Sequence, residues 1–292
     1  MTGILYIDGT DVYAQYGVAL QGSSYASVVS YPPLKKVNSN DWAEEDGIEV
    51  DLSIPVLEGI EFNPPVLDRK DVSLQFIARS KKRVGAFLQS LSDKGYHEFN
   101  FTELGRTFTL RLVSQSGDAL IPQDGDVFTL VFSDDFPLKD YQYQEPQSSL
   151  AVNTGYAIDD RDLARYGIQV LQGSEASVRS MPAVKSRLTV DINNRPGTIY
   201  DGAAPVKYQA KDVTLRCFMQ AENIAALWRN YNAFLYDLKR PSYRKLSVAA
   251  TGKSYSCYYK NGTVSRFFPD DKIWLEFTAT LVFTDFRPAE EQ

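Results

Sequence analysis

The sequence predicts an α+β, mainly β fold, in which two tandem antiparallel β-sandwich or split-barrel domains each carry one packed α-helix. Two observations lead to this prediction. Short motifs of the first half return in the same order in the second half, and each half combines the period-two pattern of β-strands with one stretch of helical period. At 292 residues the chain is long enough for two domains that each bury a core.

The repeat covers almost the whole chain. Residues 7–23 match 158–174, residues 50–52 match 190–192, residues 70–74 match 211–215, and residues 130–134 match 281–285. Because a repeat of about half the chain exceeds a solenoid unit of roughly 20–50 residues, we interpret it as a duplicated domain whose copies differ in loop length. The first domain then spans residues 1–140, a linker rich in Gln, Ser and Pro spans 141–155, and the second domain spans 156–292.

Strands and helices alternate in the same way in both halves. Apolar and polar side chains alternate over residues 72–76 and 107–112 of the first half, and over 213–220 and 275–283 of the second. This is the period of a half-buried strand. Between the strands the period becomes that of an amphipathic helix, which we predict over about residues 81–93 and again over 224–238, where Pro241 ends it.

Two long segments without a clear period, residues 23–47 and 193–205, fall at matching places. Loops of this length in compact domains usually serve a function, and these two differ between the copies, as expected if each meets a different neighbour. The candidate interface residues in them are Tyr31, Trp42, Glu44, Glu45, Asp46, Arg195, Tyr200 and Asp201.

Composition argues against several classes of partner. With a net charge of −6, stable nucleic-acid binding is not expected. No stretch approaches the roughly 20 apolar residues that span a bilayer, so no membrane insertion is expected, and residues 1–8 do not read as a signal peptide. Cys217 and Cys257 replace core hydrophobes of the other copy, which predicts buried, reduced thiols.

The sequence contains no recognisable motif of a catalytic site. His97 is the only histidine, which excludes a Ser-His-Asp triad and a two-histidine metal site, and we interpret it as a surface or boundary residue. No glycine-rich nucleotide loop is present. Pairs of acidic residues occur mostly beside Gly or Pro at strand ends, where Asp side chains bond the backbone of turns. The sequence therefore predicts no catalytic residue, no metal site and no cofactor.

The order of elements resembles the tail-tube and distal-tail protein families of long-tailed bacteriophages and related prophages. Residues 8–11 (Asp-Gly-Thr-Asp) lead to an aromatic-glycine-hydrophobic step at residues 16–18 (Tyr-Gly-Val), followed by a long hairpin or loop, strands, one helix and a closing strand. The chain departs from the distal-tail pattern because a second copy of the first domain stands where an accessory C-terminal domain would follow.

The resemblance implies a structural protein of a phage or prophage tail, and not an enzyme. Domains of these families assemble side by side into a ring with a central channel, so the implied partners are other copies of the chain, as a trimer or hexamer, and other tail proteins. The implied location is the host cytoplasm during assembly and then the virion tail.

Two other classes of function stay open. A carbohydrate- or receptor-binding β-sandwich module would show an exposed aromatic pair in one shallow groove. A hydrolase that uses an acidic pair would show two carboxylates in a shared pocket.

Overall fold

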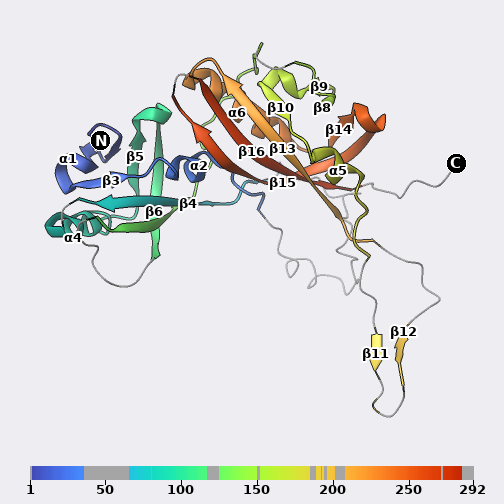
Figure 1. The fold of residues 1–292 in the computed structure, drawn as a ribbon, viewed down its shortest axis with the longest axis horizontal. Coiled ribbons are helices and arrows are strands. Elements are labelled where there is room, and N and C mark those ends of the chain that lie inside the picture. The colour runs from blue at the N-terminus through green and yellow to red at the C-terminus, as the bar shows by residue number, and fades with distance from the viewer. Residues whose placement is uncertain are drawn as a thin grey trace.

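The computed structural model describes residues 2–35, 66–79, 81–116, 125–149, 152–184, 189–191, 193, 196–200, 208–270 and 272–284. Over these ranges the chain forms two antiparallel seven-stranded sheets and a separate two-stranded hairpin, with helices packed against the sheets (Figure 1). The predicted fold class, mainly β with a packed helix in each half, is confirmed.

The elements of the first half follow the predicted alternation of strands and helix. Its strands are β1 (Leu5–Ile7), β2 (Thr10–Asp11), β3 (Val18–Leu20), β4 (Lys70–Ala78), β5 (His97–Phe101), β6 (Arg106–Ser116) and β7 (Val127–Asp134). Its helices are α1 (Val12–Tyr16), α2 (Ser24–Val29) and α4 (Lys81–Ser90).

The second half adds a hairpin to the same kinds of element. Its strands are β8 (Tyr156–Ile158), β9 (Arg161–Asp162), β10 (Ile168–Val170), β11 (Thr189–Asp191), β12 (Thr198–Tyr200), β13 (Lys211–Ala221), β14 (Arg244–Val248), β15 (Lys253–Phe268) and β16 (Ile273–Phe283). Its helices are α5 (Ser174–Arg179) and α6 (Ile224–Leu238). The hairpin of β11 and β12 projects from the body of the second half (Figure 1).

The two large sheets have the same strand order. The first reads β2-β1-β5-β6-β7-β4-β3, and the second, taken from its β9 edge, reads β9-β8-β14-β15-β16-β13-β10. Helices α2 and α5, and likewise α4 and α6, occupy matching places along the chain. This common topology supports the proposal of a tandem duplication with the domain boundaries given above.

Strand register corrects one of the sequence matches by two residues. In the first half Lys70 lies opposite Asp134, and in the second half its counterpart Lys211 lies opposite Phe283. Asp134 therefore corresponds to Phe283, and not to Asp285 as the motif match implied. Since side chains of a strand alternate between faces, a shift of two residues leaves the same face toward the core, so the hydrophobic pattern does not reveal it.

The two predicted helices are confirmed, and each buries one face. In α6 the side chain of Asn223 caps the first turn by accepting a hydrogen bond from the Ala226 N–H, and the apolar stripe that includes Tyr231 is buried. The shorter α4 buries Phe87, whose ring packs at 5.4 Å from that of Phe76 in β4. Both helices thus contribute to the core beside a long strand.

The prediction of irregular structure over 23–47 and 193–205 is wrong at two places that the structure describes, and it holds over residues 30–35. Residues 24–29 form helix α2, and residues 198–200 form strand β12. A six-residue helix has fewer than two turns, which is too short for a helical hydrophobic period to be recognised in the sequence. Residues 36–47, 194, 195 and 201–205 lie outside the described residues.

Both cysteines are free and buried in the core of the second half, as the sequence predicted. Burial raises the pKa of the Cys217 thiol far above its ordinary value, and it raises that of Cys257 to about 12. Neither thiol is therefore ionised at neutral pH, and neither is accessible to a reagent.

We expect a thiol reagent such as DTNB to modify no cysteine of the folded protein at about pH 8 and two cysteines after denaturation without a reductant. The measurement is the absorbance of the released thiolate before and after adding denaturant. Rapid modification of the folded protein, or no free thiol in the denatured protein, would contradict this expectation.

Candidate assembly surfaces

Tyr31 joins the two halves of the chain. Its side chain is 4% exposed, and its ring stacks on that of Tyr231 in α6, with centroids 4.0 Å apart and planes 15° from parallel. The rings of Tyr259 and Phe277 meet it edge to face at 6.4 and 5.8 Å. An aromatic residue of the first half is thus built into the core of the second.

The hydroxyl groups buried in this contact all have partners. The Tyr31 Oη donates to the Tyr231 carbonyl at 2.7 Å, and the Tyr231 Oη donates to the Val29 carbonyl at 3.1 Å. The Tyr259 Oη donates to the Pro32 carbonyl at 2.8 Å. Burial raises the pKa of Tyr31 well above its ordinary value of 10.0, so the hydroxyl remains a donor. Because polar groups are costly to bury unpaired, these reciprocal bonds fix the position of the Tyr31 ring.

The edge of β15 is shaped to receive the segment that follows α2. The Leu34 N–H donates to the carbonyl of Lys260, the bulged residue of β15, at 2.8 Å, and the Ser30 Oγ accepts from the Val264 N–H at 2.9 Å. At Gly262 a Cβ atom would lie 2.9 Å from Tyr31 Cδ2 and 2.9 Å from the Thr278 carbonyl oxygen. A side chain at position 262 would therefore displace the Tyr31 ring.

A second contact between the halves lies around Trp228 of α6. Its Nε1 donates to the Leu104 carbonyl at 2.7 Å, and the Arg106 guanidinium lies over its ring at 4.9 Å. The same guanidinium lies over the ring of Phe108 at 5.5 Å. The start of β6 is thereby held against the helix of the other half.

The segment proposed as a linker, residues 141–155, packs along α6 over part of its length. Tyr143 and Tyr166 both donate to the buried Asp237 carboxylate, at 3.1 and 2.6 Å, and Arg161 pairs with the same oxygen at 2.9 Å. Further along, the Gln147 N–H donates to Asn230 at 2.9 Å. The connection between the halves is therefore held by side-chain hydrogen bonds and does not cross between them as a free tether.

Helices α2 and α5 seal equivalent strand edges. In the first half Ser27 and Ser24 accept hydrogen bonds from the N–H groups of Ser73 and Gln75 in β4, each at 2.8 Å. In the second half Ser177 and Ser174 accept from Thr214 and Arg216 in β13, each at 2.9 Å. Serine oxygens thus occupy strand donors that would otherwise be open to another strand.

A buried lysine completes each of these clamps. Lys70 donates to the carbonyls of Val28 and Ser30 at 2.6 and 3.0 Å, at the C-terminal end of α2. Lys211 donates to the Val178 carbonyl at the matching end of α5. Burial lowers the pKa of Lys70 to about 8, so it is still protonated at neutral pH and suits the negative end of the helix.

The interpretation of His97 as a surface or boundary residue is wrong, because its side chain is 3% exposed. Its Nδ1 lies 2.7 Å from Asp8 Oδ2, and its Nε2 lies 3.1 Å from the Leu91 carbonyl. Asp8 also accepts from Lys94 and the Glu98 N–H. His97 therefore ties the β1–β2 turn to β5.

The second half has the same tie with different residues. Arg244 begins β14 as His97 begins β5, and it pairs with Asp159 Oδ2 at 2.7 Å. Asp8 and Asp159 both adopt left-handed backbone, with φ of 50° and 47°. This repetition favours a structural over a catalytic role for the histidine.

We call the contact of Tyr31 and the segment after α2 with the second half the seam. The hollow beside this seam has no catalytic set of side chains. It has a volume of about 600 Å³ and lies between α2, β4 and β15; hydroxyl and amide groups line much of it, among them Ser27, Ser73, Gln75, Thr129, Asn261 and Thr263. Among the residues that the structure describes, no group of three His, Cys, Asp or Glu side chains could hold a metal ion. In the same part of the chain, no helix is long and apolar enough to cross a membrane.

The structure describes only two of the predicted interface residues. Tyr31 is in the intramolecular seam, and Tyr200 ends strand β12 of the projecting hairpin. Trp42, Glu44, Glu45, Asp46, Arg195 and Asp201 lie outside the described residues.

Sequence reasoning missed the receiving side of the seam. Tyr231 lies in the predicted helix over 224–238 and Tyr259 in the strand that carries Cys257, but nothing in the sequence links either residue to Tyr31. One signal was available: the two matched halves carry Tyr31-Pro32 and Met181-Pro182 at equivalent places after a short serine-rich segment.

Fold and contacts together define a mainly β protein whose two equivalent halves lie side by side and interlock. No protein-family model matches the chain, and no curated protein matches it. Among solved structures it is similar to the crystal structure of the Dit protein (gp 19.1) of phage SPP1, described as a paradigm of the hub adsorption apparatus in phages that infect Gram-positive bacteria.

The match to the SPP1 protein has a TM-score of 0.37 and 14% sequence identity, and it covers 44% of this chain and 49% of that chain. It thus spans about half the length of the SPP1 protein.

Replacing Tyr31 with alanine is expected to lower the free energy of unfolding by about 3–5 kcal/mol, the cost typical of removing a buried aromatic ring. Tyr31→Phe, which keeps the ring and loses the bond to the Tyr231 carbonyl, should cost about 1 kcal/mol. Urea unfolding measures both values. Tyr208→Ala, at a tyrosine 38% exposed, is the matched control and should change little. If Tyr31→Ala and the wild type were equally stable, the contact of Tyr31 with the second half would not contribute to stability, contrary to this expectation.

Asp8→Asn is expected to destabilise the protein more at neutral pH than in acid. Burial raises the pKa of Asp8, but the hydrogen bonds to its two oxygens outweigh burial and hold the pKa at about 2, below the ordinary 3.8. A carboxylate with a lowered pKa stabilises the folded state above pH 3.8, and this stabilisation is lost as the pH falls toward 2. Asparagine tolerates the left-handed backbone at this position, so the turn is kept.

The measurement is urea unfolding at about pH 7 and at about pH 2.5, where the difference between wild type and Asp8→Asn should shrink. Asp160→Asn, in the β8–β9 turn of the second half at a carboxylate that is 79% exposed, is the control. A difference that stays constant with pH would show that the Asp8 charge is not the cause.

Proposed function

We propose that this chain is a structural component of a phage or prophage tail, of the distal-tail, tube or hub kind, which assembles into a ring through protein–protein contacts. Its partners are other copies of itself and other tail proteins, first in the host cytoplasm and then in the virion tail. It is not an enzyme, it uses no cofactor, and it neither binds nucleic acid stably nor inserts into a membrane.

The observation that carries this proposal is the seam at Tyr31. The first half contributes the segment after α2, and the second half contributes α6 and the edge of β15. The contact is therefore heterologous, since the two halves use different surfaces. Heterologous contacts between similar units leave one unused surface on each outer side, and repeated by rotation they generate rings.

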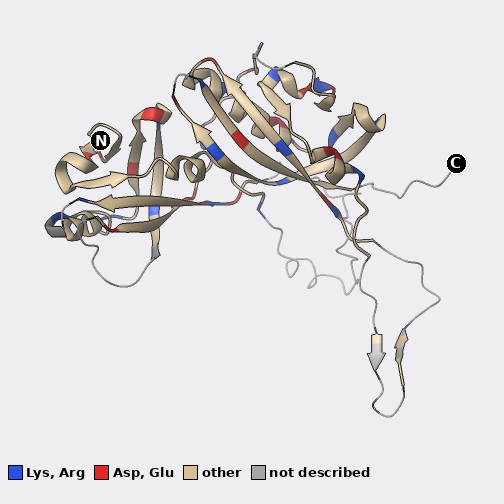
Figure 2. Cartoon of the chain, in the orientation of Figure 1, with Lys and Arg blue, Asp and Glu red and all other residues tan. Residues whose placement is uncertain are grey.

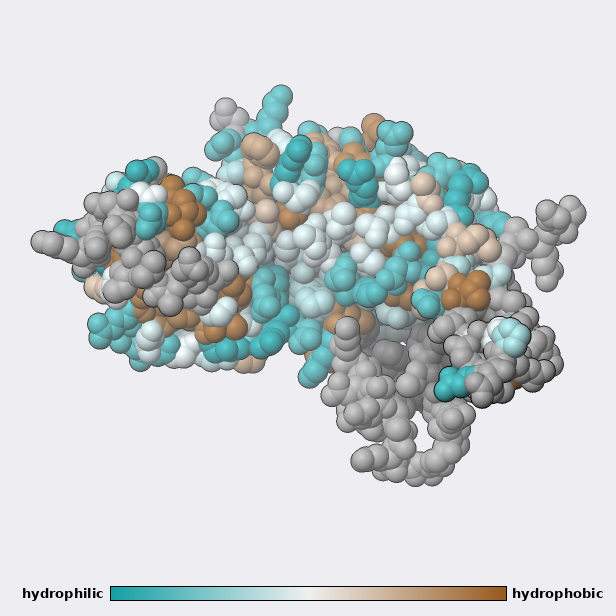
Figure 3. Space-filling model, turned by 60° about the horizontal axis from the view of Figure 1, so that its bottom comes forward, coloured by the Kyte–Doolittle hydropathy of each residue, from teal (hydrophilic) through white to brown (hydrophobic). Residues whose placement is uncertain are grey.

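The charge distribution agrees with a structural role. Acidic and basic residues both occur along the ribbons of the two halves (Figure 2). The net charge of −6 suits a channel through which DNA passes without adhering. On the face shown in Figure 3, hydrophobic residues form separate small patches among polar ones, as expected for contacts between subunits that are also soluble before assembly.

The purified chain is expected to form an oligomer whose mass is a defined multiple of 32.8 kDa. Three chains would place six similar domains in one ring, and a hexamer of two stacked layers is the competing geometry. Light scattering gives the mass, and negative-stain images give the symmetry. A chain that stays monomeric at high concentration, both alone and with its tail partners, would rule out the ring.

A carbohydrate- or receptor-binding module is the second candidate, because exposed aromatic pairs exist. The rings of Tyr96 and Phe136, both exposed, lie 6.1 Å apart. The ring of Phe268 stacks on that of Trp274 at 4.2 Å, and Phe268 is partly exposed. Neither pair is among the residues that line the hollow of the seam, whereas such a module needs an aromatic pair in a groove. Binding of a glycan in an array, abolished by Trp274→Ala, would favour this candidate.

A further inference from the structure

We infer that residues 180–184, the segment that follows α5, dock on the free edge of β6 in a second copy of the chain, repeating between chains the contact that Tyr31 makes within one. This inference rests on the proposed function and names the surfaces through which the ring would close. It follows from comparing the same two surfaces in the two halves.

The segment that docks on the strand edge, called the donor segment, exists twice in the chain. Residues 30–34 follow α2, and residues 180–184 follow α5. Each helix is clamped to its sheet by the same serine and lysine contacts, and each segment then forms an isolated bridge to a later residue, Leu34 to Leu67 and Val184 to Tyr208. The two segments therefore leave their sheets at equivalent places.

Only one of the two donor segments is covered. Tyr31 is 4% exposed against the second half, whereas Met181, at the equivalent position, is 57% exposed, and Val184, equivalent to Leu34, is 54% exposed. Pro182 is buried, as Pro32 is, so the second segment is anchored and still presents its apolar side chains. No described residue accepts a hydrogen bond from the Val184 N–H, whose counterpart at Leu34 donates to β15.

The receiving edge also exists twice. β15 pairs with β14 only as far as Cys257. Residues 30–34 of the first half cover the edge of β15 beyond Cys257. β6 pairs with β5 only as far as Leu110, and no described strand continues the sheet on that side. Register matches Leu110 with Cys257, since they face His97 and Arg244 at the start of the equivalent strands.

The two edges share the irregularity that receives the donor. β15 has two bulges; the first falls at Lys260, between Tyr259 and Asn261, and the Lys260 carbonyl accepts from the Leu34 N–H. In β6 the bulge falls at Val113, between Leu112 and Ser114. Val113 is 44% exposed and occupies the register position of Lys260. Its carbonyl is thus the expected acceptor for the Val184 N–H of another chain.

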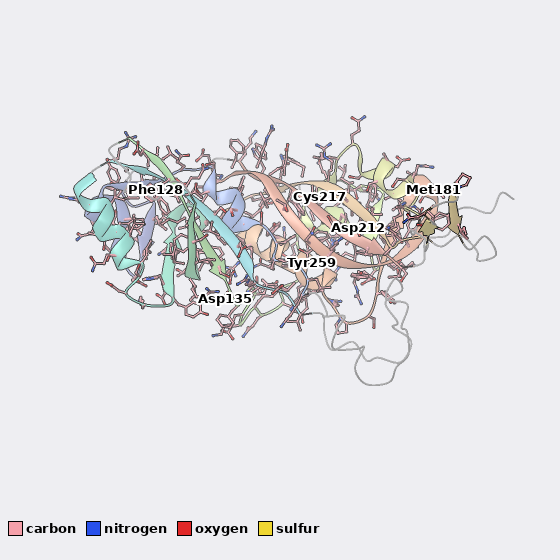
Figure 4. The ribbon with its side chains drawn as sticks, turned by 90° about the horizontal axis from the view of Figure 1, so that it is seen from below. Phe128, Asp135, Met181, Asp212, Cys217 and Tyr259 are labelled. Carbon is pink, nitrogen blue, oxygen red and sulfur yellow. The ribbon has the colours of Figure 1, made fainter. Side chains whose placement is uncertain are left out.

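The free donor and the free edge lie far apart in one chain. Figure 4 shows Met181 toward one end of the long axis, Tyr259 of the occupied edge near the middle, and Phe128, at the start of the strand next to β6, toward the other end. In this arrangement residues 180–184 of a chain cannot reach the β6 edge of the same chain. A second copy can, and the contact repeats head to tail.

The first test is a cross-link between single cysteines. Val113→Cys and Val184→Cys variants, mixed and treated with a short thiol cross-linker, are expected to give a dimer, and the double variant is expected to give a ladder that ends at the closed ring. The native cysteines are buried, so the wild type is the background control. Leu34→Cys combined with Lys260→Cys should cross-link within one chain and shows that the geometry suits the reagent.

The second test is Met181→Asp, which is expected to shift the mass from the oligomer toward the 32.8 kDa monomer while urea unfolding stays close to that of the wild type. Val152→Asp, at a valine that is 77% exposed and lies outside both surfaces, is the matched control and should leave the oligomer intact. Unfolding of the Met181→Asp monomer at lower urea would instead assign Met181 to the fold of the second half and overturn the inference.

The outcomes separate this inference from the proposed function. An oligomer of defined size that neither cross-links through positions 113 and 184 nor responds to Met181→Asp would overturn the inference and leave the ring to other surfaces. A chain that is monomeric under every condition would overturn both. Cross-linking together with dissociation by Met181→Asp supports both.

Discussion

The insertion of Tyr31 into the second half is the interaction on which the arrangement of the molecule depends. A buried aromatic ring contributes a large apolar area, but its hydroxyl is costly to bury without a partner. Tyr31 and Tyr231 solve this by each donating to a carbonyl of the other half, so the bonds hold only in one relative position of the two sheets. Gly262 leaves the space that the ring needs. The seam is therefore specific as well as apolar, and two sheets of the same topology are fixed in one orientation.

The clamps at α2 and α5 explain why this contact has a direction. A sheet with open edges could pair with neighbours at either side, but serine oxygens occupy the donors of β4 and β13. Because Lys70 also ties the end of α2 to β4, the segment after the helix leaves the sheet at a defined place. The far edge of each β6-type strand is not closed within its own half: residues 30–34 of the first half cover that of β15, and no described strand covers that of β6. Sealing one edge and leaving another open gives each half one donor side and one receiving side.

The sequence was sufficient for the long strands β4, β6, β13 and β16, the two longer helices and the buried cysteines, because each of these follows from a hydrophobic period within one element. It was insufficient where the outcome depends on contacts between distant residues. The mismatch of Asp134 with Asp285 arose because a two-residue shift preserves the strand pattern. His97 was misplaced because its partner Asp8 lies 89 residues away in the sequence. Tyr31 does lie in irregular structure, but its contact with Tyr231 was missed because the ring that stacks on it belongs to the other half.

If the seam repeats between chains, the difference between Tyr31 in the first half and Met181 in the second has a physical explanation. Within the chain the donor is Tyr31, a rigid ring with a satisfied hydroxyl, and such a contact need form only once, during folding. Between chains the equivalent residue is Met181, whose flexible side chain carries no hydroxyl that must be desolvated while the subunit is still free. A tyrosine exposed at that position would gain its hydrogen bonds only after docking, and until then water would satisfy it. Methionine packs against a less demanding surface, which suits an interface that assembles from folded and separately soluble subunits.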